Sequence, residues 1–316
     1  MTLILKPKSI EQLKEMLGKA TSRRPVTAFD LSRIAGVRQH TPEDLTATVA
    51  AGTTLADLQS TLRSHGQWLP LDPPRPTGLS IGGLIAGNAS GPHRYGLGTV
   101  RDYLIGIKVV LGNGSESNSG GRVVKNVAGF DLPKLFVGSR GSLGVILEAT
   151  FKLAPLPEAR LVFEVSLENA EELVRVGRRL LDRGLSPCVL DGHRMARGKA
   201  NASAAYLVVG FVGSKDEVTD QGDRLQSMLS ARPATLDYQD QFWQVRGKAG
   251  VEHDSVLPSE LGDRLQELKK EPWVARVGNG VIYYRTSDGK PAREPTLLER
   301  RLKEAFDPRR ILPPIP

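Results

Sequence analysis

Apolar residues recur with two periods along the first half of the chain, and each period predicts its own elements. A helical spacing follows Ser9–Gln12, which has the sequence of a capping box, and Thr54–Asp57, so helices are expected there. Alternating apolar runs predict strands, because successive side chains of a strand point to opposite faces. These strands are expected over Pro25 to Phe29, Thr46 to Ala51, Tyr103 to Leu111 and Val145 to Leu153. The turn sequence Asn113-Gly114 predicts a hairpin after the third of them.

The second half predicts a different rhythm of strands and helices. Strands are expected over Arg160 to Leu167, Pro187 to Leu190, Ala205 to Val212 and Thr235 to Tyr238. Helices opened by Asn169 and Ser214 separate the first pair and the last pair. The resulting order, strand-helix-strand-strand-helix-strand, is the pattern of ferredoxin-like domains. Further helices are expected over Leu257 to Lys270 and from Thr296 to Phe306, with a strand ending at Tyr284 between them.

Prolines divide the chain. The segment from Leu69 to Pro76 contains four prolines, which remove ladder donors and fix φ, so a rigid extended loop is expected. Pro155 and Pro157 mark the expected domain boundary, and 316 residues are enough for two domains. The expected division is a first domain over residues 1–156 and a second over residues 157–316, which ends in a tail.

The composition is that of an ordinary globular protein, with 40% apolar and 25% charged residues. No apolar run is long enough to span a membrane, and Met1 to Pro7 is too short for a signal peptide. The net charge of +8 is spread in pairs and only 5% of residues are aromatic, so nucleic-acid binding is not expected. The single cysteine, Cys188, excludes an internal disulfide and a cysteine-ligated cluster, and the scattered histidines predict no metal site. We expect a cytoplasmic protein.

Two glycine-rich segments stand out between Leu79 and Ile146. The first is Ser80 to Gly91 and the second is Val137 to Ile146. Without a Cβ, such backbone lets another molecule approach closely and exposes its N–H groups, so a phosphate-bearing cofactor is one expectation. The alternative is that both segments are tight turns between core strands.

With Arg101-Asp102 and the run Lys125 to Leu132, these segments make the chain resemble the FAD-linked oxidases that have a vanillyl-alcohol-oxidase (PCMH) type of FAD domain. Within that family it is most similar to the FAD-binding subunit of bacterial glycolate oxidase, over about Thr41 to Pro157. The resemblance implies an α+β fold, in which a two-part PCMH-type FAD-binding domain is followed by a ferredoxin-like cap. It also implies FAD as cofactor and a small 2-hydroxy acid as substrate. The implied partners are a homologous FAD subunit and an iron–sulfur subunit, with no direct membrane insertion and at most a peripheral place at the inner membrane.

By this resemblance, the residues that contact the cofactor come from both glycine segments and from a loop before them. They are Asp72, Pro73, Ser80, Ile81, Gly82, Gly83, Asn88, Ser90, Gly91, Gly141, Ser142, Gly144 and Val145. Two departures from the family concern the same site. The family's glycine-rich loop, which wraps the diphosphate, falls here on Val26 to Asp30, which contain no glycine, so that loop is expected to be deleted. Arg140 stands where relatives often carry an acidic residue.

Oxidation of a 2-hydroxy acid needs a base for the hydroxyl proton and a cation for the carboxylate, besides the flavin. His93 lies beside Arg94 just after the first glycine-rich run and is the best-placed base. Arg246 and Arg285 are candidates to hold the carboxylate, because arginine suits bidentate pairing. His193 has no supporting partner in the sequence. For each of these residues the alternative is a structural histidine or a solvated arginine.

Three functions stay open at this stage. The first is the FAD-binding subunit of a glycolate-oxidase-like complex in which another subunit performs the main oxidation. The second is a non-catalytic scaffold with weakened FAD binding, which the missing glycine loop favours. The third is a stand-alone FAD-dependent oxidoreductase. The flavin content of the purified protein and turnover by the isolated chain distinguish them.

Overall fold

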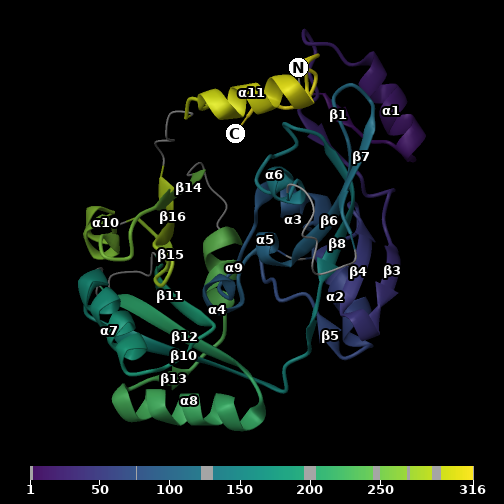
Figure 1. Ribbon diagram of the computed structural model, residues 1–316. Coiled ribbons are helices and arrows are strands. Elements are labelled where there is room, and N and C mark those ends of the chain that lie inside the picture. The colour runs from purple at the N-terminus through teal and green to yellow at the C-terminus, as the bar shows by residue number, and fades with distance from the viewer. Residues whose placement is uncertain are drawn as a thin grey trace. The chain divides into compact units, whose positions relative to one another are not determined.

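The computed structural model describes residues 3–75, 77–121, 131–195, 204–244, 250–268, 271–286 and 293–315 (Figure 1). The chain forms two compact units. The first contains Met1–Ser90, Thr99–Leu156 and Ala292–Pro316, and the second contains Gly91–Gly98 and Pro157–Pro291. The chain passes from the first unit into the long segment of the second unit after Leu156, which lies between the two expected boundary prolines. The division differs from two consecutive domains in two places, because 91–98 packs with the second unit and the C-terminal segment returns to the first.

The first unit is built on an antiparallel sheet in the order β3-β4-β8-β6-β7. Its strands are β3 (Val37–Thr41), β4 (Thr46–Ala50), β6 (Leu104–Val110), β7 (Glu116–Gly120) and β8 (Val145–Lys152). The expected hairpin is confirmed, since β6 and β7 pair from Val110 opposite Glu116 around the Asn113-Gly114 turn. Two small sheets flank it, formed by β1 (Ile4–Leu5) with β2 (Ala28–Phe29) and by β5 (Gln67–Trp68) with β9 (Ala154–Pro155). The strand expected over Pro25 to Phe29 is therefore reduced to two residues.

Short helices surround this sheet. They are α1 (Ile10–Lys19), a 3₁₀ turn at Pro42–Asp44, α2 (Leu55–Arg63), α3 (Ile81–Gly87), α5 (Val100–Tyr103), α6 (Pro133–Phe136) and α11 (Leu297–Phe306). The capping signals are confirmed. The side-chain oxygens of Ser9 and Thr54 accept hydrogen bonds from N–H groups in the first turns of α1 and α2. Thr296 and Glu299 form a full capping box at α11.

Helix α3 is one of several elements of the first unit that the sequence did not predict, and it is the one that bears on the site. Glycine is a poor helix former, so Ser80 to Gly91 was expected as exposed backbone or a tight turn. The helix forms because Ser80 caps it and because its core face, Ile81, Leu84 and Ile85, is completely buried. Close packing explains the first glycine, since a Cβ at Gly82 would lie 3.1 Å from the Cβ of Ala51.

The second unit contains a seven-stranded antiparallel sheet in the order β13-β10-β12-β11-β15-β16-β14. Its strands are β10 (Ala159–Leu167), β11 (Val189–Arg194), β12 (Ala205–Gly213), β13 (Arg232–Pro233), β14 (Gly250–Ser255), β15 (Trp273–Arg276) and β16 (Val281–Thr286). The first four strands, with α7 (Ala170–Asp182) and α8 (Lys215–Met228), form the expected ferredoxin-like arrangement. The predicted position of the fourth strand was wrong. The strand is Arg232–Pro233, whereas the predicted segment, Thr235 to Tyr238, runs into the start of α9 (Asp237–Gln244).

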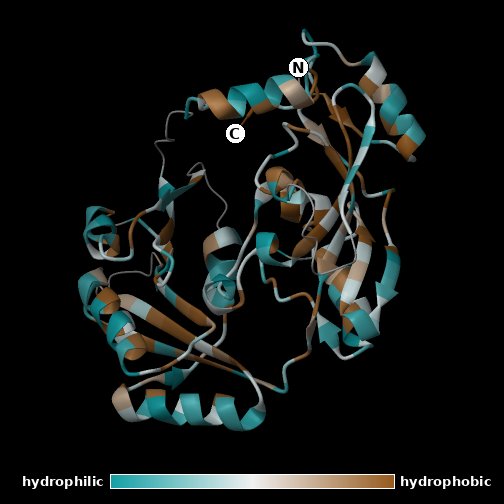
Figure 2. Ribbon diagram, in the orientation of Figure 1, coloured by the Kyte–Doolittle hydropathy of each residue, from teal (hydrophilic) through white to brown (hydrophobic). Residues whose placement is uncertain are grey.

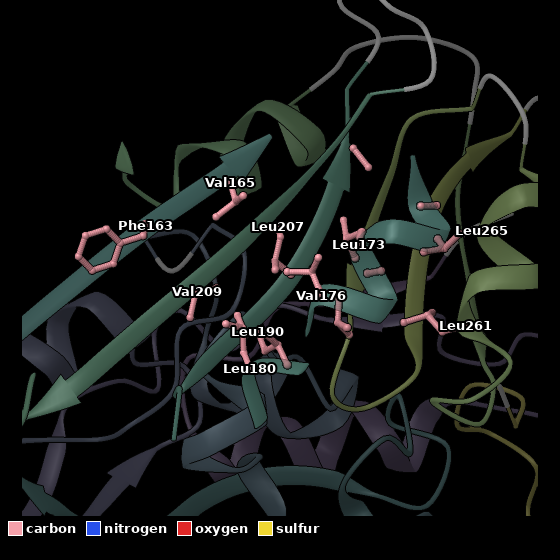
Figure 3. Packing of buried hydrophobic residues seen from close by; sticks show 14 of the residues in the cluster. Phe163, Val165, Leu173, Val176, Leu180, Leu190, Leu207, Val209, Leu261 and Leu265 are labelled. Carbon is pink, nitrogen blue, oxygen red and sulfur yellow. The ribbon is translucent and has the colours of Figure 1, made fainter. Parts of the chain in front are cut away.

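Both faces of this sheet are covered within the second unit. One face packs against α7, α8 and α10 (Leu261–Glu267), and Figure 3 shows Leu173 and Val176 of α7 beside Leu207 and Leu190 of the sheet. The alternate residues of the same strands, such as Val189 and Val274, pack with Tyr238 and Phe242 of α9. Figure 2 shows strands that are hydrophobic over much of their length beside the mostly hydrophilic α8. No helix within the described part of the chain is long and apolar enough to cross a membrane.

Candidate functional site

A groove of about 250 Å³ lies in the first unit where four parts of the chain meet. It is formed by the residues around β2, the end of β4, the α3 helix with the loop that follows α6, and the C-terminal tail. Its lining consists of Thr27, Ala28, Phe29, Leu31, Ala51, Ser80, Gly82, Gly83, Ala86, Arg140, Gly141, Gly144, Val145, Ile146 and Pro313. Most of these residues are small or apolar, so the groove offers a smooth surface to a ligand.

Helix α3 supplies the floor of the groove through its small residues. Gly82, Gly83 and Ala86 face the groove, whereas the large apolar residues of the helix face the core. The first N–H groups of the helix are already bonded, because Gly82 donates to the carbonyl of Ala51 at 2.8 Å and Gly83 to Ser80 Oγ at 3.1 Å. Ile81 donates to the carbonyl of Thr53. The helix therefore provides close approach for a ligand rather than free donors at its N-terminus.

The second glycine segment is docked onto the C-terminal half of α3. The N–H of Gly138 donates to the carbonyl of Ile85 at 3.0 Å, and that of Arg140 to the carbonyl of Ala86 at 2.9 Å. Arg140 and Gly141 both have left-handed backbone, with φ of 47° and 81°. This turn carries the chain along the groove wall and into β8.

Gly144 plays a structural part in this wall. A Cβ there would lie 3.0 Å from the carbonyl oxygen of Val110 and 3.2 Å from the ring of Phe136. We expect Gly144→Val to lower the free energy of unfolding by about 1–3 kcal/mol, since backbone cannot give way like a flexible side chain. Gly78→Val is the control, because a Cβ there meets open space, and its change should stay within about 0.5 kcal/mol. Urea denaturation measures both; equal stability of the two variants would contradict this packing.

The C-terminal tail reaches the groove because Asp307 and Lys303 hold it. The carboxylate of Asp307, fully buried, accepts from the N–H groups of Ile311 and Leu312 at 3.1 and 3.0 Å. Lys303 Nζ donates to Asp307 and to the carbonyls of Ser142 and Pro313. These bonds tie the tail to the second glycine segment and place Pro313 in the groove wall.

The side chain of Phe29 lies in the segment where the family has its glycine-rich loop, which the sequence predicts to be deleted here. Phe29 lines the groove, and its Cε2 lies 3.5 Å from where a Cβ of Gly141 would be. Asp30 does not line the groove. It accepts hydrogen bonds from Ser32, which lower the pKa of its carboxyl group, and pairs with Lys6 at 3.2 Å. The described residues around β2 thus contribute an apolar wall without negative charge.

The structure brings six of the expected cofactor residues together in this groove, namely Ser80, Gly82, Gly83, Gly141, Gly144 and Val145. The other seven lie elsewhere. Ile81 is in the core, and Ser142, 2% exposed, lines a separate hollow beside Leu302. Gly91 belongs to the second unit, and Asp72, Pro73, Asn88 and Ser90 are outside the groove lining. Their contact with the cofactor stays a prediction.

Several lining residues escaped the list of expected contacts. Ala51, Ala86 and Pro313 carry no motif, and only the fold brings them together. Ala86 had a usable signal, because it follows Gly82 at helical spacing on the same face. Phe29 and Arg140 were noted only as departures from the family.

None of the catalytic candidates within the described residues lines the groove. His93, 6% exposed, and Arg94 belong to the second unit, where α4 (Arg94–Leu97) packs on β11 and Gly96 donates to the carbonyl of Cys188. Arg285 is buried and donates through Nε to the carbonyl of Phe242 at 3.0 Å. Arg246 and the run 122–130 lie outside the described residues.

The second unit contains a buried polar cluster that the sequence did not reveal. Asp191 and Arg276 form an ion pair with no exposed side-chain surface. Tyr238 donates to Asp191 at 2.5 Å, and burial, with this carboxylate beside it, raises the pKa of the Tyr238 phenol well above its usual range. His193 also has partners, since its ring stacks 4.7 Å from that of Tyr238 and its Nε2 lies 3.0 Å from Glu164 Oε1. These contacts bind α9 to the sheet.

Comparison with known proteins decides what the first unit is. Residues 12–119 match the family described as "FAD binding domain". The first unit carries an FAD-binding domain. The cofactor of this chain is accordingly FAD, and the expected fold class, a mixed PCMH-type FAD domain with a second α+β unit, is confirmed.

Three further similarities extend this result. The chain is 40% identical over 157 residues to glycolate oxidase subunit GlcE of Escherichia coli, covering 48% of this chain and 45% of that protein. It is 30% identical to a D-lactate dehydrogenase of Archaeoglobus fulgidus over 84% of this chain and 64% of the relative. A solved alkyldihydroxyacetonephosphate synthase shares the fold, with a TM-score of 0.70 and 17% identity over 98% of this chain and 76% of the other. The match thus spans less than half the length of the glycolate oxidase subunit.

The FAD domain offers features that fit part of this cofactor. A groove of 250 Å³ is below the usual size of a site for a whole drug-sized ligand, so it accommodates one portion of a dinucleotide. The floor of Gly82, Gly83 and Ala86 allows close approach, and Arg140 supplies a positive charge at the wall.

Proposed function

We propose that this chain is the FAD-binding subunit of a glycolate-oxidase-like complex that oxidises a 2-hydroxy acid. The observation that carries the proposal is the groove lined by small residues in a domain that matches the FAD binding family. The names of the relatives support the reaction class, since they include glycolate oxidase subunits and D-lactate dehydrogenases. We further propose a cytoplasmic location, with electrons passing to a partner subunit.

The proposed reaction removes a hydride from the hydroxyl-bearing carbon and a proton from its oxygen. Bound FAD would accept the hydride. The residues of this chain hold the cofactor: α3 gives it a floor, and the turn at Arg140-Gly141 gives it a wall. In the proposed complex a homologous FAD subunit performs the main oxidation, and an iron–sulfur subunit receives the electrons.

One observation favours a second candidate, a scaffold that binds FAD weakly. Phe29 and Pro313 both approach Gly141, at 3.5 and 3.7 Å from the position of its missing Cβ, and narrow the groove between them. No glycine loop is present at Val26 to Asp30 to wrap a diphosphate. Under this alternative the chain keeps the fold and supports its partners without turnover of its own.

The visible spectrum of the purified complex, and of this chain purified alone, tests the proposal. We expect flavin absorbance in this chain and loss of that absorbance when glycolate or D-lactate is added to the complex without oxygen. Addition of L-alanine, which lacks the hydroxyl group, is the control and should leave the spectrum unchanged. A chain that never carries flavin supports the scaffold. Full turnover of hydroxy acids by the isolated chain would contradict the subunit role.

A further inference from the structure

Arg140 is the only charged residue among the described residues that line the groove. Its side chain is exposed. The guanidinium makes no hydrogen bond or ion pair with another described residue. The other lining residues are small, apolar or hydroxyl-bearing, and none is a carboxylate. The groove therefore has a positive charge on its wall without an internal counter-charge.

The backbone of Arg140 is in a conformation that favours glycine. Its φ of 47° lies in the left-handed region, which costs a non-glycine residue free energy and persists only where the surroundings impose it. The surroundings impose it here, because the Arg140 N–H is bonded to the carbonyl of Ala86 and the next residue, Gly141, is also left-handed. Glycine would be less strained at this position, so the backbone conformation does not itself favour an arginine here.

A second donor accompanies the guanidinium. The N–H groups of Arg140 and Ser142 are bonded to the carbonyls of Ala86 and Ser139. The N–H of Gly141 has no acceptor among the described residues, and Gly141 lines the groove. Consecutive left-handed or turn residues form concave arrangements of N–H groups that bind anions. A cation and a free N–H thus meet at one point of the wall.

We propose that Arg140 binds the diphosphate of FAD and substitutes for the deleted glycine loop. A guanidinium forms bidentate, charge-assisted hydrogen bonds to phosphate oxygens, which here take the place of the neutral N–H donors of a glycine-rich loop. The inference rests on the proposed function, because it assumes that the groove holds FAD. It assigns to this residue the part of the cofactor that carries charge, and leaves the isoalloxazine ring to other contacts.

The test compares FAD with riboflavin, which has the same isoalloxazine ring and ribityl chain but lacks the diphosphate and the adenosine. We expect Arg140→Gln to weaken FAD binding about 10- to 100-fold, the effect of one charge-assisted contact, and to leave riboflavin binding unchanged. Arg140→Gly should weaken FAD equally while the Tm stays the same or rises, because the strain is relieved. Binding is measured by quenching of flavin fluorescence in the apoprotein, at low and high salt.

Arg310→Gly is the matched control. Arg310 is also an exposed arginine with left-handed backbone, at φ 52°, and does not line the groove, so this variant should bind FAD like the wild type. Ala86→Leu, which fills the groove, separates this inference from the proposed function. If Ala86→Leu loses FAD but Arg140→Gln binds FAD like the wild type, only the role of Arg140 is overturned. If Ala86→Leu also binds FAD like the wild type, the proposed function of the groove fails. A parallel loss of riboflavin binding in Arg140→Gln would also overturn the assignment to the diphosphate.

Discussion

Asp191→Ala is expected to lower the free energy of unfolding of the second unit by about 3–5 kcal/mol. The change leaves the guanidinium of Arg276 buried without its carboxylate, since neither side chain of the pair has exposed surface. It also removes the acceptor of the Tyr238 hydroxyl group. An unpaired buried charge costs far more than the net gain from the pair, so this loss should exceed that of ordinary substitutions in the same sheet.

Two comparisons make the Asp191 result interpretable. Asp182→Ala removes an exposed carboxylate from α7 and should change stability by no more than about 0.5 kcal/mol. Replacement of both partners, Asp191→Leu with Arg276→Met, should lose less than Asp191→Ala, because no charge is left unpaired. Urea denaturation followed by tryptophan fluorescence measures all three. A loss below 1 kcal/mol for Asp191→Ala would contradict a buried ion pair.

Ala86→Leu is expected to abolish FAD binding with the fold retained. Ala86 lies on the groove face of α3, where its half-buried side chain lines the groove and also touches the edge of the core. A leucine side chain there occupies space that the cofactor needs, and leucine is an excellent helix former. We expect the affinity for FAD to fall by at least about 100-fold, with the Tm near that of the wild type; equilibrium dialysis and thermal unfolding measure these.

The control for this variant is the neighbouring residue of the same helix. Gly87 is exposed, and a Cβ there meets no atom within 4 Å, so Gly87→Leu adds the same side chain outside the groove. It should bind FAD like the wild type. Unchanged FAD affinity in Ala86→Leu would place the cofactor elsewhere on this chain.

Local signals predicted much of the fold. Caps at Asn169, Ser214 and Thr296 correctly opened α7, α8 and α11, because a side-chain oxygen at that position satisfies free N–H groups of the first turn. Helix α3 was not predicted in this way, because its tertiary packing against Ala51 outweighs the low helix propensity of its glycines. The three strands beyond the ferredoxin-like core were also incompletely foreseen, since their pairing joins segments far apart in the sequence.

The candidate site was predictable where glycine marks it and hidden where it depends on tertiary structure. Gly82, Gly83 and Gly141 point to close approach from the sequence alone. Pro313 joins them only because Asp307 and Lys303 fold the tail back, more than 170 residues after Gly141. His193 looked isolated in the sequence because its partners come from other elements.

Hydrogen–deuterium exchange with and without FAD tests most directly whether this groove holds the cofactor. Exchange reports which backbone N–H groups a ligand protects. FAD should slow exchange in peptides that cover 138–146, where the N–H of Gly141 has no acceptor among the described residues, and in those that cover 80–87. Saturating FAD that leaves both segments unchanged and protects other parts of the chain would contradict the account.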